Sequence, residues 1–176
     1  MRLEGKTAIV TGAGSGFGAG IARKFAAEGA QVFVVDINLE GAQAIAAEIG
    51  GTAIACDVSS GKSVSHLAKT VLSDESLDIL VNNAGVTHLP NQMEKVTEAD
   101  FDRVYHVNMK SVFLTAQAFV PHFKKRGAGA ILNVASTAGI SPRPRLNWYN
   151  ASKGWMITAT KTMAVELAPN GIRVIA

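Results

Sequence analysis

The residues best suited to chemistry lie in the stretch WYNASKGW, residues 148–155, where a tyrosine stands four positions before a lysine. If this stretch is helical, Tyr149 and Lys153 lie one turn apart on the same face. An ammonium so close favours a phenolate over a phenol, which suits a tyrosine acting as a general acid or base. The same spacing also fits an ordinary surface contact, so the interpretation depends on what the rest of the chain supplies.

Two more polar residues are candidates for the same site. Ser136 ends a predicted strand 13 residues before Tyr149, and we expect its hydroxyl above the carboxyl edge of a sheet, facing the helix that carries Tyr149. Asn108 falls inside a long predicted helix, where an amide side chain is a mediocre helix former. It is either a solvated helix residue or a group whose side chain holds a water near Lys153.

A glycine-rich loop, TGAGSGFG at residues 11–18, follows the first predicted strand and opens the first predicted helix. Gly12 allows a tight turn, Gly16 lets the backbone approach a ligand, and Gly18 permits close packing of helix on strand. The helix start offers unpaired N–H groups and a positive dipole end to a pyrophosphate. Ser15 and Phe17 complete the loop, and we expect both at the same dinucleotide site.

An acidic residue ends the second predicted strand. Asp36 lies 18 residues beyond Gly18, where a carboxylate accepts hydrogen bonds from a ribose 2′-OH and repels a 2′-phosphate. The residues that follow it, Ile37 and Asn38, include no arginine to bind that phosphate. The carboxylate also fits a helix cap, and both roles are compatible. We therefore predict that NAD(H) is preferred over NADP(H).

Two later strand ends extend this site. Asp57 and Val58 follow the third predicted strand, where they either meet an adenine or cap the strand end. The sequence NNAG, residues 82–85, ends the fourth. Asparagine tolerates unusual backbone angles, while Ala84 and Gly85 leave space for a ligand. We therefore place Asn83, Ala84 and Gly85 beside the cofactor.

The order of elements predicts an α/β fold. Short apolar runs rich in β-branched residues alternate with helical patterns, as expected of strands buried on both faces. Repeated β–α steps imply a parallel sheet with right-handed crossovers and a helical layer on each face, a three-layer, doubly wound Rossmann-type domain. We expect a single domain over residues 1–176. The predicted strands are 7–11, 31–36, 52–56, 78–82, 130–136 and 172–176, and the predicted helices lie near 16–28, 39–49, 61–72, 98–126 and 150–168.

Composition argues against several other classes of protein. The chain is 48% hydrophobic and 18% charged, which is typical of a globular chain, and its net charge of +3 is spread too thinly to predict nucleic-acid binding. The one basic run, Lys124 to Arg126, falls where a helix should end. Cys56 is the only cysteine, and the four histidines lack metal-ligand spacing, so we expect no metal site. Without a predicted signal peptide or membrane span, we expect the cytoplasm.

The chain resembles the short-chain dehydrogenase/reductase family over essentially all of its 176 residues. The resemblance implies a Rossmann-type domain, a nicotinamide cofactor, a small carbonyl or alcohol substrate, and a homodimer or homotetramer. It rests on features that occur here in the family's order and spacing: TGAGSGFG, Asp36, Asp57, NNAG, Asn108, Ser136 and YNASK.

The resemblance also implies a role for each matching side chain. Tyr149 would be the general acid/base, and Ser136 would bind the substrate oxygen. Lys153 would hold the nicotinamide ribose and stabilise the phenolate, and Asn108 would support a proton-relay water. Within the family, the chain is most similar to 3-oxoacyl-(acyl-carrier-protein) reductases, with sugar and polyol dehydrogenases as the alternative.

The chain departs from the family pattern at its end. Relatives typically continue into a loop against the nicotinamide, a substrate cover and a seventh strand, whereas this sequence stops at GIRVIA, within the sixth predicted strand. A non-catalytic dinucleotide-binding module is therefore a second interpretation. The two longest predicted helices carry large apolar residues on more than one face, which favours a dimer. These residues are Phe113, Phe119, Trp155 and Met163.

Overall fold

A six-stranded parallel sheet forms the centre of the molecule. The computed structural model describes residues 1–73 and 77–176. Its strand order is β3-β2-β1-β4-β5-β6, so the order reverses between β1 and β4, and every neighbouring pair is parallel. This confirms the predicted doubly wound sheet. The strands are β1 (Thr7–Thr11), β2 (Gln31–Asp36), β3 (Thr52–Ala55), β4 (Ile79–Asn82), β5 (Gly129–Asn133) and β6 (Ile172–Ile175).

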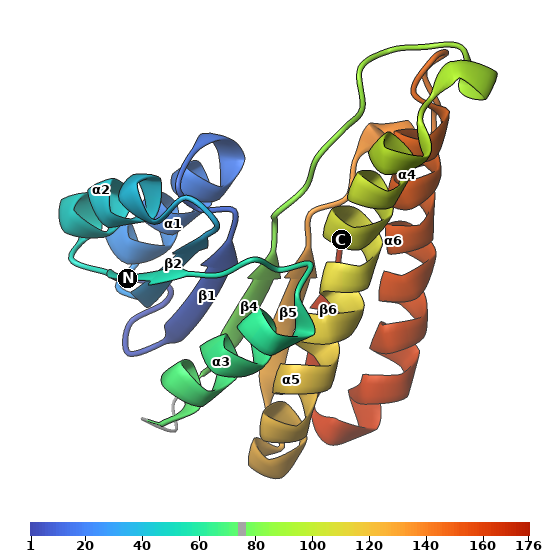
Figure 1. The fold of residues 1–176 in the computed structure, drawn as a ribbon. Coiled ribbons are helices and arrows are strands. Elements are labelled where there is room, and N and C mark those ends of the chain that lie inside the picture. Colours follow the sequence, from blue (N-terminus) through green and yellow to red (C-terminus); the bar gives the residue numbers. More distant parts are fainter. Residues whose placement is uncertain (74–76) are drawn as a thin grey trace.

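Helices cover both faces of this sheet, with α1 and α2 on one side and α3, α5 and α6 on the other (Figure 1). The α-helices are α1 (Gly16–Ala27), α2 (Leu39–Ile49), α3 (Gly61–Leu72), α4 (Glu98–Val104), α5 (Ser111–Arg126) and α6 (Asn147–Leu167). Shorter helical segments are η1 (Met93–Lys95), η2 (Tyr105–Lys110), η3 (Thr137–Gly139) and η4 (Ala168–Asn170). No helix in the described ranges is long and apolar enough to cross a lipid bilayer.

Alternation along the strands divides the core into two layers. In β1, Ile9 packs into the layer that includes α3 and α5, whereas its neighbour Val10 packs into the layer under α1 and α2. Successive side chains of a strand point to opposite faces, so an apolar run without polar breaks supplies both layers. Phe119 and Phe123 fill the first layer from α5 and are fully buried.

Local signals fix several helix ends. Thr97 caps α4 by accepting a hydrogen bond from the backbone N–H of Asp100, and Gly127 ends α5 with a φ of 66°. The basic run Lys124 to Arg126 lies in the last turn of α5, as predicted. Arg126 donates to the carbonyl oxygen of Leu77 at 2.6 Å and to the carboxylate of Asp78 at 3.0 Å.

Three differences from the sequence prediction affect the candidate site. The long helix predicted over 98–126 is interrupted by η2, a π-helical segment that separates α4 from α5. Strand β5 ends at Asn133, so Ser136 lies beyond the strand and caps η3 instead. Helix α6 begins at Asn147, three residues before the predicted start, and therefore includes Tyr149 in its first turn. At η2 the difference accompanies long-range hydrogen bonds, from Asn108 to Val86 and Ser152, that a local pattern does not contain.

Candidate active site

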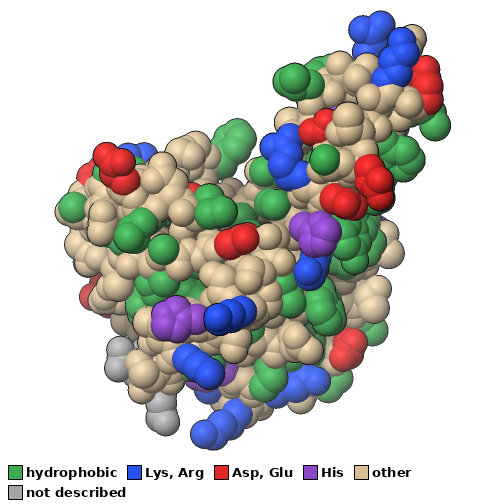
Figure 2. Space-filling view, viewed as in Figure 1, with side chains coloured by type: hydrophobic (Ala, Val, Ile, Leu, Met, Phe, Trp, Pro, Cys, Tyr) green, Lys and Arg blue, Asp and Glu red, His purple; other side chains and the backbone are tan. Residues whose placement is uncertain are grey.

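A cleft of about 560 Å³ opens at the carboxyl ends of the strands, where the strand order reverses. This is the position at which open α/β sheets bind ligands. Figure 2 shows the surface hollowed between the lobe of α1 and α2 and the arm that projects beside α4. All the predicted cofactor residues outside α6 line this cleft: Gly12, Ser15, Gly16, Phe17, Gly18, Asp36, Asp57, Val58, Asn83, Ala84 and Gly85.

The glycine-rich loop is fastened to the turn after β4. Gly12 has a φ of 64°, and a Cβ there would lie only 2.8 Å from the Cα of Ala84. The side-chain amide of Asn83 donates to the carbonyl oxygens of Thr11 (2.8 Å) and Gly12 (3.1 Å). A Cβ at Gly18 would overlap the carbonyl oxygen of Gly12 and the same amide. Glycine is therefore required at both positions by the close approach of two strand ends.

The start of α1 faces the cleft without a side-chain cap. Ser15 is the N-cap residue, yet its hydroxyl accepts no hydrogen bond from the first turn. Ser15, Gly16 and Phe17 are exposed and line the cleft. First-turn N–H groups and the positive end of the helix dipole together form a site suited to an anion such as a pyrophosphate. The residues present therefore fit the phosphate part of a dinucleotide.

The two strand-end carboxylates also organise their own loops. Asp36 accepts from the backbone N–H groups of Gly14 and Asn38, each at 2.9 Å. Asp57 accepts from the backbone N–H of Ser59 at 2.9 Å and from its hydroxyl at 2.6 Å. The helix cap considered for Asp36 is provided instead by Asn38, which accepts from the backbone N–H of Gly41, whereas Asp57 does cap the end of its strand. Because both aspartates are only half-buried and line the cleft, their carboxylates are also within reach of a ligand.

Tyr149 and Lys153 share one face of α6. The ammonium nitrogen of Lys153 lies 5.9 Å from the centre of the Tyr149 ring and donates to the carbonyl oxygen of Val134 at 2.8 Å. Only 4% of Lys153 is exposed, and burial lowers the pKa of its ammonium. A Cβ at Gly85 would lie 3.5 Å from that nitrogen, which puts the ammonium against the NNAG turn that lines the cleft.

Asn108 is fully buried within η2 and uses its amide to join two other segments. The amide nitrogen donates to the carbonyl oxygen of Val86 (2.9 Å) and to the hydroxyl of Ser152 (3.0 Å), and the amide oxygen accepts from the backbone N–H of Val86 (2.8 Å). Both amide hydrogens are therefore engaged, so this side chain could hold the water expected from the sequence only through its single amide oxygen, which already accepts from Val86. Ser152 in turn donates to the carbonyl oxygen of Tyr149.

Ser136 does not line the cofactor cleft. Its hydroxyl accepts from the backbone N–H of Ala138 at 3.1 Å, and the residue belongs to a separate, mostly apolar groove of about 700 Å³. That groove lies between α6 and the ends of β5 and β6, and its apolar side chains include Ile140, Ile157 and Val174. The predicted substrate-binding serine thus stands beside an apolar surface next to α6.

Sequence reasoning missed six residues of the cleft wall: Ile37, Cys56, Ser59, Val86, Arg103 and Val107. Four of these adjoin residues that the strand-end argument did select. Arg103 and Val107 lie one turn apart, on α4 and η2. Their positions shortly before Asn108 in the sequence were the only signal that could have placed them at the site. Arg103 donates to the carbonyl oxygen of Thr87 at 3.0 Å, which ties α4 to the segment after β4.

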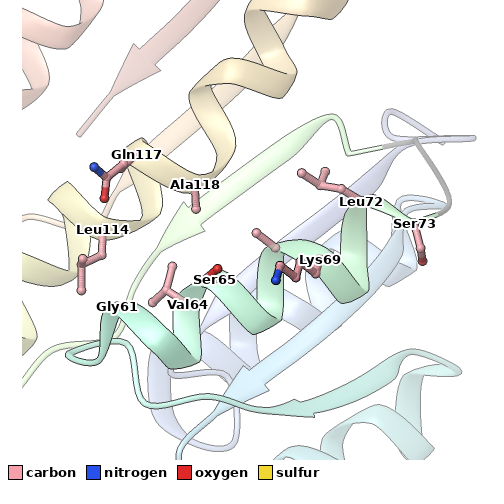
Figure 3. A pocket seen from close by; sticks show the side chains of 10 residues that line it. Gly61, Val64, Ser65, Lys69, Leu72, Ser73, Leu114, Gln117 and Ala118 are labelled. Atoms are coloured by element: carbon pink, nitrogen blue, oxygen red, sulfur yellow. The ribbon is translucent and has the colours of Figure 1, made fainter.

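A hollow of about 550 Å³ lies elsewhere, between α3 and α5 (Figure 3). Its walls include Val64, Leu72 and Leu114, and Lys69 is the only titratable side chain among the described residues that line it. A lone ammonium on an apolar wall supplies no acid–base pair. Over residues 1–73 and 77–176, no three His, Cys, Asp or Glu side chains gather in a way that would hold a metal ion.

Comparison with known proteins identifies the family. Residues 6–176 match the family model for short chain dehydrogenases, and the chain belongs to this family of NAD(P)-dependent oxidoreductases. It is 48% identical to 4-formylbenzenesulfonate dehydrogenase TsaC1/TsaC2 of Comamonas testosteroni, over 99% of this chain and 71% of that protein. It is 40% identical to D-threitol dehydrogenase of Mycolicibacterium smegmatis, over 99% of this chain and 69% of that protein.

A solved structure agrees closely with the fold. The crystal structure of 3-ketoacyl-(acyl-carrier-protein) reductase from Brucella melitensis, complexed with NADH, superimposes with a TM-score of 0.96 at 49% identity. The match covers 98% of this chain and 74% of that one. The chain thus corresponds to roughly 70% of the length of its relatives.

Proposed function

We propose that this chain carries the catalytic centre of an oxidoreductase that interconverts a ketone and a secondary alcohol with NAD(H). The observation that carries the proposal is the position of Lys153. Its buried ammonium lies on one face of α6 with Tyr149 and against Gly85 of the cofactor cleft. A proton-transferring phenol, a fixed positive charge and a dinucleotide cleft thus meet at one sheet edge.

Each side chain then has a distinct role. Tyr149 gives a proton to the developing alkoxide or takes one from the alcohol, and Lys153 stabilises its phenolate form. Ser136 donates a hydrogen bond to the substrate oxygen, where charge develops. Asn108 supports the proton path from its place between Val86 and Ser152. The bound nicotinamide supplies or accepts the hydride.

A preference for NAD(H) over NADP(H) is part of this proposal. The carboxylate of Asp36 lines the cleft and is held in place by the N–H groups of Gly14 and Asn38. A fixed anion there favours a ribose 2′-OH and repels a 2′-phosphate. Support also comes from similar structures, which were solved with NADH (49% identical) and with NAD+ (a xylitol dehydrogenase, 35% identical).

For the substrate, we propose a 3-oxoacyl thioester of acyl carrier protein, on the likeness to the Brucella melitensis reductase. A polyol is the second candidate, on the likeness to D-threitol dehydrogenase. The likeness to 4-formylbenzenesulfonate dehydrogenase, at 48% identity, adds an aryl aldehyde to the panel that a substrate screen should contain. The apolar groove beside Ser136 suits the hydrocarbon part of an acyl or aryl substrate.

We also infer that the chain forms a homodimer or homotetramer through α5 and α6. Phe113 is 57% exposed and Trp155 is 36% exposed, and both line a shallow apolar groove between these helices. Phe119, by contrast, is fully buried in the core, so only part of the predicted apolar surface is available. Light scattering should give a mass of twice or four times the chain, and Trp155→Glu should shift it toward monomer.

The decisive experiment is calorimetric titration with NADH and then NADPH, followed by turnover assays with the three substrate classes. Binding of NADH with reduction of a ketone, or oxidation of a polyol in the reverse direction, supports the proposed function. Binding without turnover leaves a dinucleotide-binding module, the second interpretation of the sequence. If neither cofactor binds, the proposal is wrong for this chain.

A further inference from the structure

Two buried polar side-chain atoms have no hydrogen-bond partner among the described residues, and one of them belongs to the residue that follows the proposed catalytic tyrosine. They are Nε2 of His88 and Oδ1 of Asn150. His88 is 1% exposed and Asn150 is 7% exposed, so bulk solvent does not satisfy either atom. Buried polar groups nearly always have a partner, and leaving one without a partner is costly. Both atoms therefore call for a hydrogen-bond donor.

The surrounding bonds show that both atoms are acceptors. Nδ1 of His88 lies 2.8 Å from the carbonyl oxygen of Leu89, an acceptor that only an N–H can approach so closely, so Nδ1 carries the proton. In the neutral imidazole, Nε2 then presents a lone pair. The amide nitrogen of Asn150 donates to the carbonyl oxygen of Arg143 at 2.7 Å, which fixes Oδ1 as the free end of that amide.

Hydrogen bonds on either side of His88 hold its segment against the segment that contains Asn150. On one side, Val86 is joined through the amide of Asn108 to Ser152 in α6. On the other, the backbone N–H of Asn91 donates to the carbonyl oxygen of Arg145 at 3.0 Å. His88 therefore lies between Val86 and Asn91, the two residues of its segment that are linked to the other segment. Asn150 lies between the residues to which they are linked, Arg145 and Ser152.

We propose that one buried water bridges these residues, donating one hydrogen to Nε2 of His88 and the other to Oδ1 of Asn150. A water has two hydrogens and makes two to four bonds in such sites, which matches two acceptors on segments that are bonded to each other. The bridge fastens residues 86–91 to the first turn of α6, where Tyr149 precedes Asn150. His88 is thus a positioning residue for Tyr149, and this role rests on the proposed function. The site is separate from any proton-relay water at Asn108.

Other occupants fit less well. A substrate hydroxyl would have to reach two side chains that are more than nine-tenths buried, and neither residue is among those that line the cofactor cleft or the apolar groove beside Ser136. A direct bond between the two side chains would require Nε2 to carry a hydrogen while Nδ1 keeps its own, which makes the ring a cation. Water is the smallest neutral donor that satisfies both acceptors.

The first test is a crystal structure of the NADH complex at a resolution that orders internal waters. We expect one water within hydrogen-bond distance, roughly 2.7–3.2 Å, of both atoms. A structure in which the side chains bond directly, or in which the two atoms are too far apart for one molecule to reach both, overturns the proposal. This test does not depend on turnover, so it separates failure of the bridge from failure of the proposed function.

The second test is kinetic and uses conservative rescue. His88→Leu removes the acceptor, and we expect kcat to fall roughly tenfold or more while the Kd for NADH stays within about twofold, because a small displacement of a reacting group is costly. His88→Gln restores an acceptor and should recover most of the loss. His122→Leu is the matched control, since His122 also meets a backbone carbonyl (Leu77, 3.3 Å) but lies in α5, away from Tyr149. Equal losses in His88→Leu and His88→Gln, or a raised Kd for NADH, would contradict the positioning role.

Discussion

The ammonium nitrogen of Lys153 lies 2.8 Å from the carbonyl oxygen of Val134. This bond joins α6 to the segment that leaves β5, two residues before Ser136. A second close contact supports it, because a Cβ at Gly139 would lie 2.7 Å from the carbonyl carbon of Lys153. Tyr149 and Lys153, proposed to transfer the proton and to stabilise the phenolate, are therefore on one segment. Ser136, proposed to bind the substrate oxygen, is on a second segment that is bonded to the first. Several measurable consequences come from this arrangement.

Replacing Tyr149 with phenylalanine should abolish turnover and leave cofactor binding intact. The substitution removes the proton-transferring hydroxyl and preserves the ring beside Lys153. We expect kcat to fall about 10²- to 10⁴-fold, the range for loss of a general acid/base, with the Kd for NADH changed by less than about twofold. Steady-state kinetics and calorimetry measure the two quantities. Substantial residual turnover would remove Tyr149 from the catalytic role.

Because of Lys153, the free energy of unfolding should depend on pH in the alkaline range. Burial lowers the pKa of its ammonium below the ordinary value of 10.5, and no carboxylate of the described residues forms an ion pair with it. Between the folded and unfolded pKa values the unfolded chain binds more protons, so the free energy of unfolding contributed by this group rises with pH in that window. It is lowest once the pH is below the folded pKa.

The check is urea unfolding of wild type and Lys153→Met across this alkaline range. We expect wild type to gain stability relative to the variant as the pH rises toward 10.5, and the variant to lose turnover about 10²-fold or more. A stability difference that does not change with pH, or that changes in the opposite direction, would contradict a buried, destabilised ammonium.

Cofactor preference should depend on the carboxylate of Asp36. We expect wild type to bind NADH at least about tenfold more tightly than NADPH, and Asp36→Asn to narrow that ratio by removing the repulsion of a 2′-phosphate. An asparagine oxygen can still accept from Gly14, so the loop should persist. Asp57→Asn is the control, because Asp57 also lines the cleft but bonds Ser59. The ratio of the Kd for NADPH to the Kd for NADH should be the same in Asp57→Asn as in wild type.

The glycine-rich loop should respond differently to alanine at two neighbouring positions. At Gly18 the added Cβ would overlap Gly12 and Asn83, so Gly18→Ala should lower Tm by several degrees and weaken NADH binding about tenfold or more. At Gly20, also in α1, nothing lies within 4 Å of the added Cβ. Gly20→Ala should therefore raise stability by about 0.5–1 kcal/mol. Similar effects at both positions would mean that the close approach is not what requires Gly18.

A buried chain of hydrogen bonds should couple α5, the sheet and α6. Thr115 donates to Asn82, whose amide nitrogen donates to Asn133, which donates to Thr160, each at 2.9 Å. Asn133→Leu leaves the buried amide of Asn82 without an acceptor and should cost about 2–3 kcal/mol. In a double-mutant cycle with Asn82→Leu, the second substitution should cost less than it does alone. Additive losses would show that Asn82 and Asn133 act independently.

The sequence by itself determined the features that rest on local pattern. Apolar runs fixed the strands, because a strand buried on both faces has no polar break, and spacing put Tyr149 and Lys153 on one helix face. The glycine-rich loop and the strand-end residues Asp36 and Asp57 were found because a parallel sheet brings its carboxyl ends to one edge. All of these inferences use neighbours in the chain, or one rule about sheets.

Only the tertiary structure decided which groups are satisfied and which are not. From the sequence, Asn108 was either a solvated helix residue or a side chain that holds a water. In the structure its amide joins Val86 to Ser152, 22 and 44 residues away. Those long-range bonds accompany the π-helical turn that divides the predicted helix. His88 was one of four histidines without metal-ligand spacing, and folding buried its ring with no partner for Nε2 among the described residues. Local sequence does not report such pairings, because each depends on the simultaneous placement of segments that are distant in the chain.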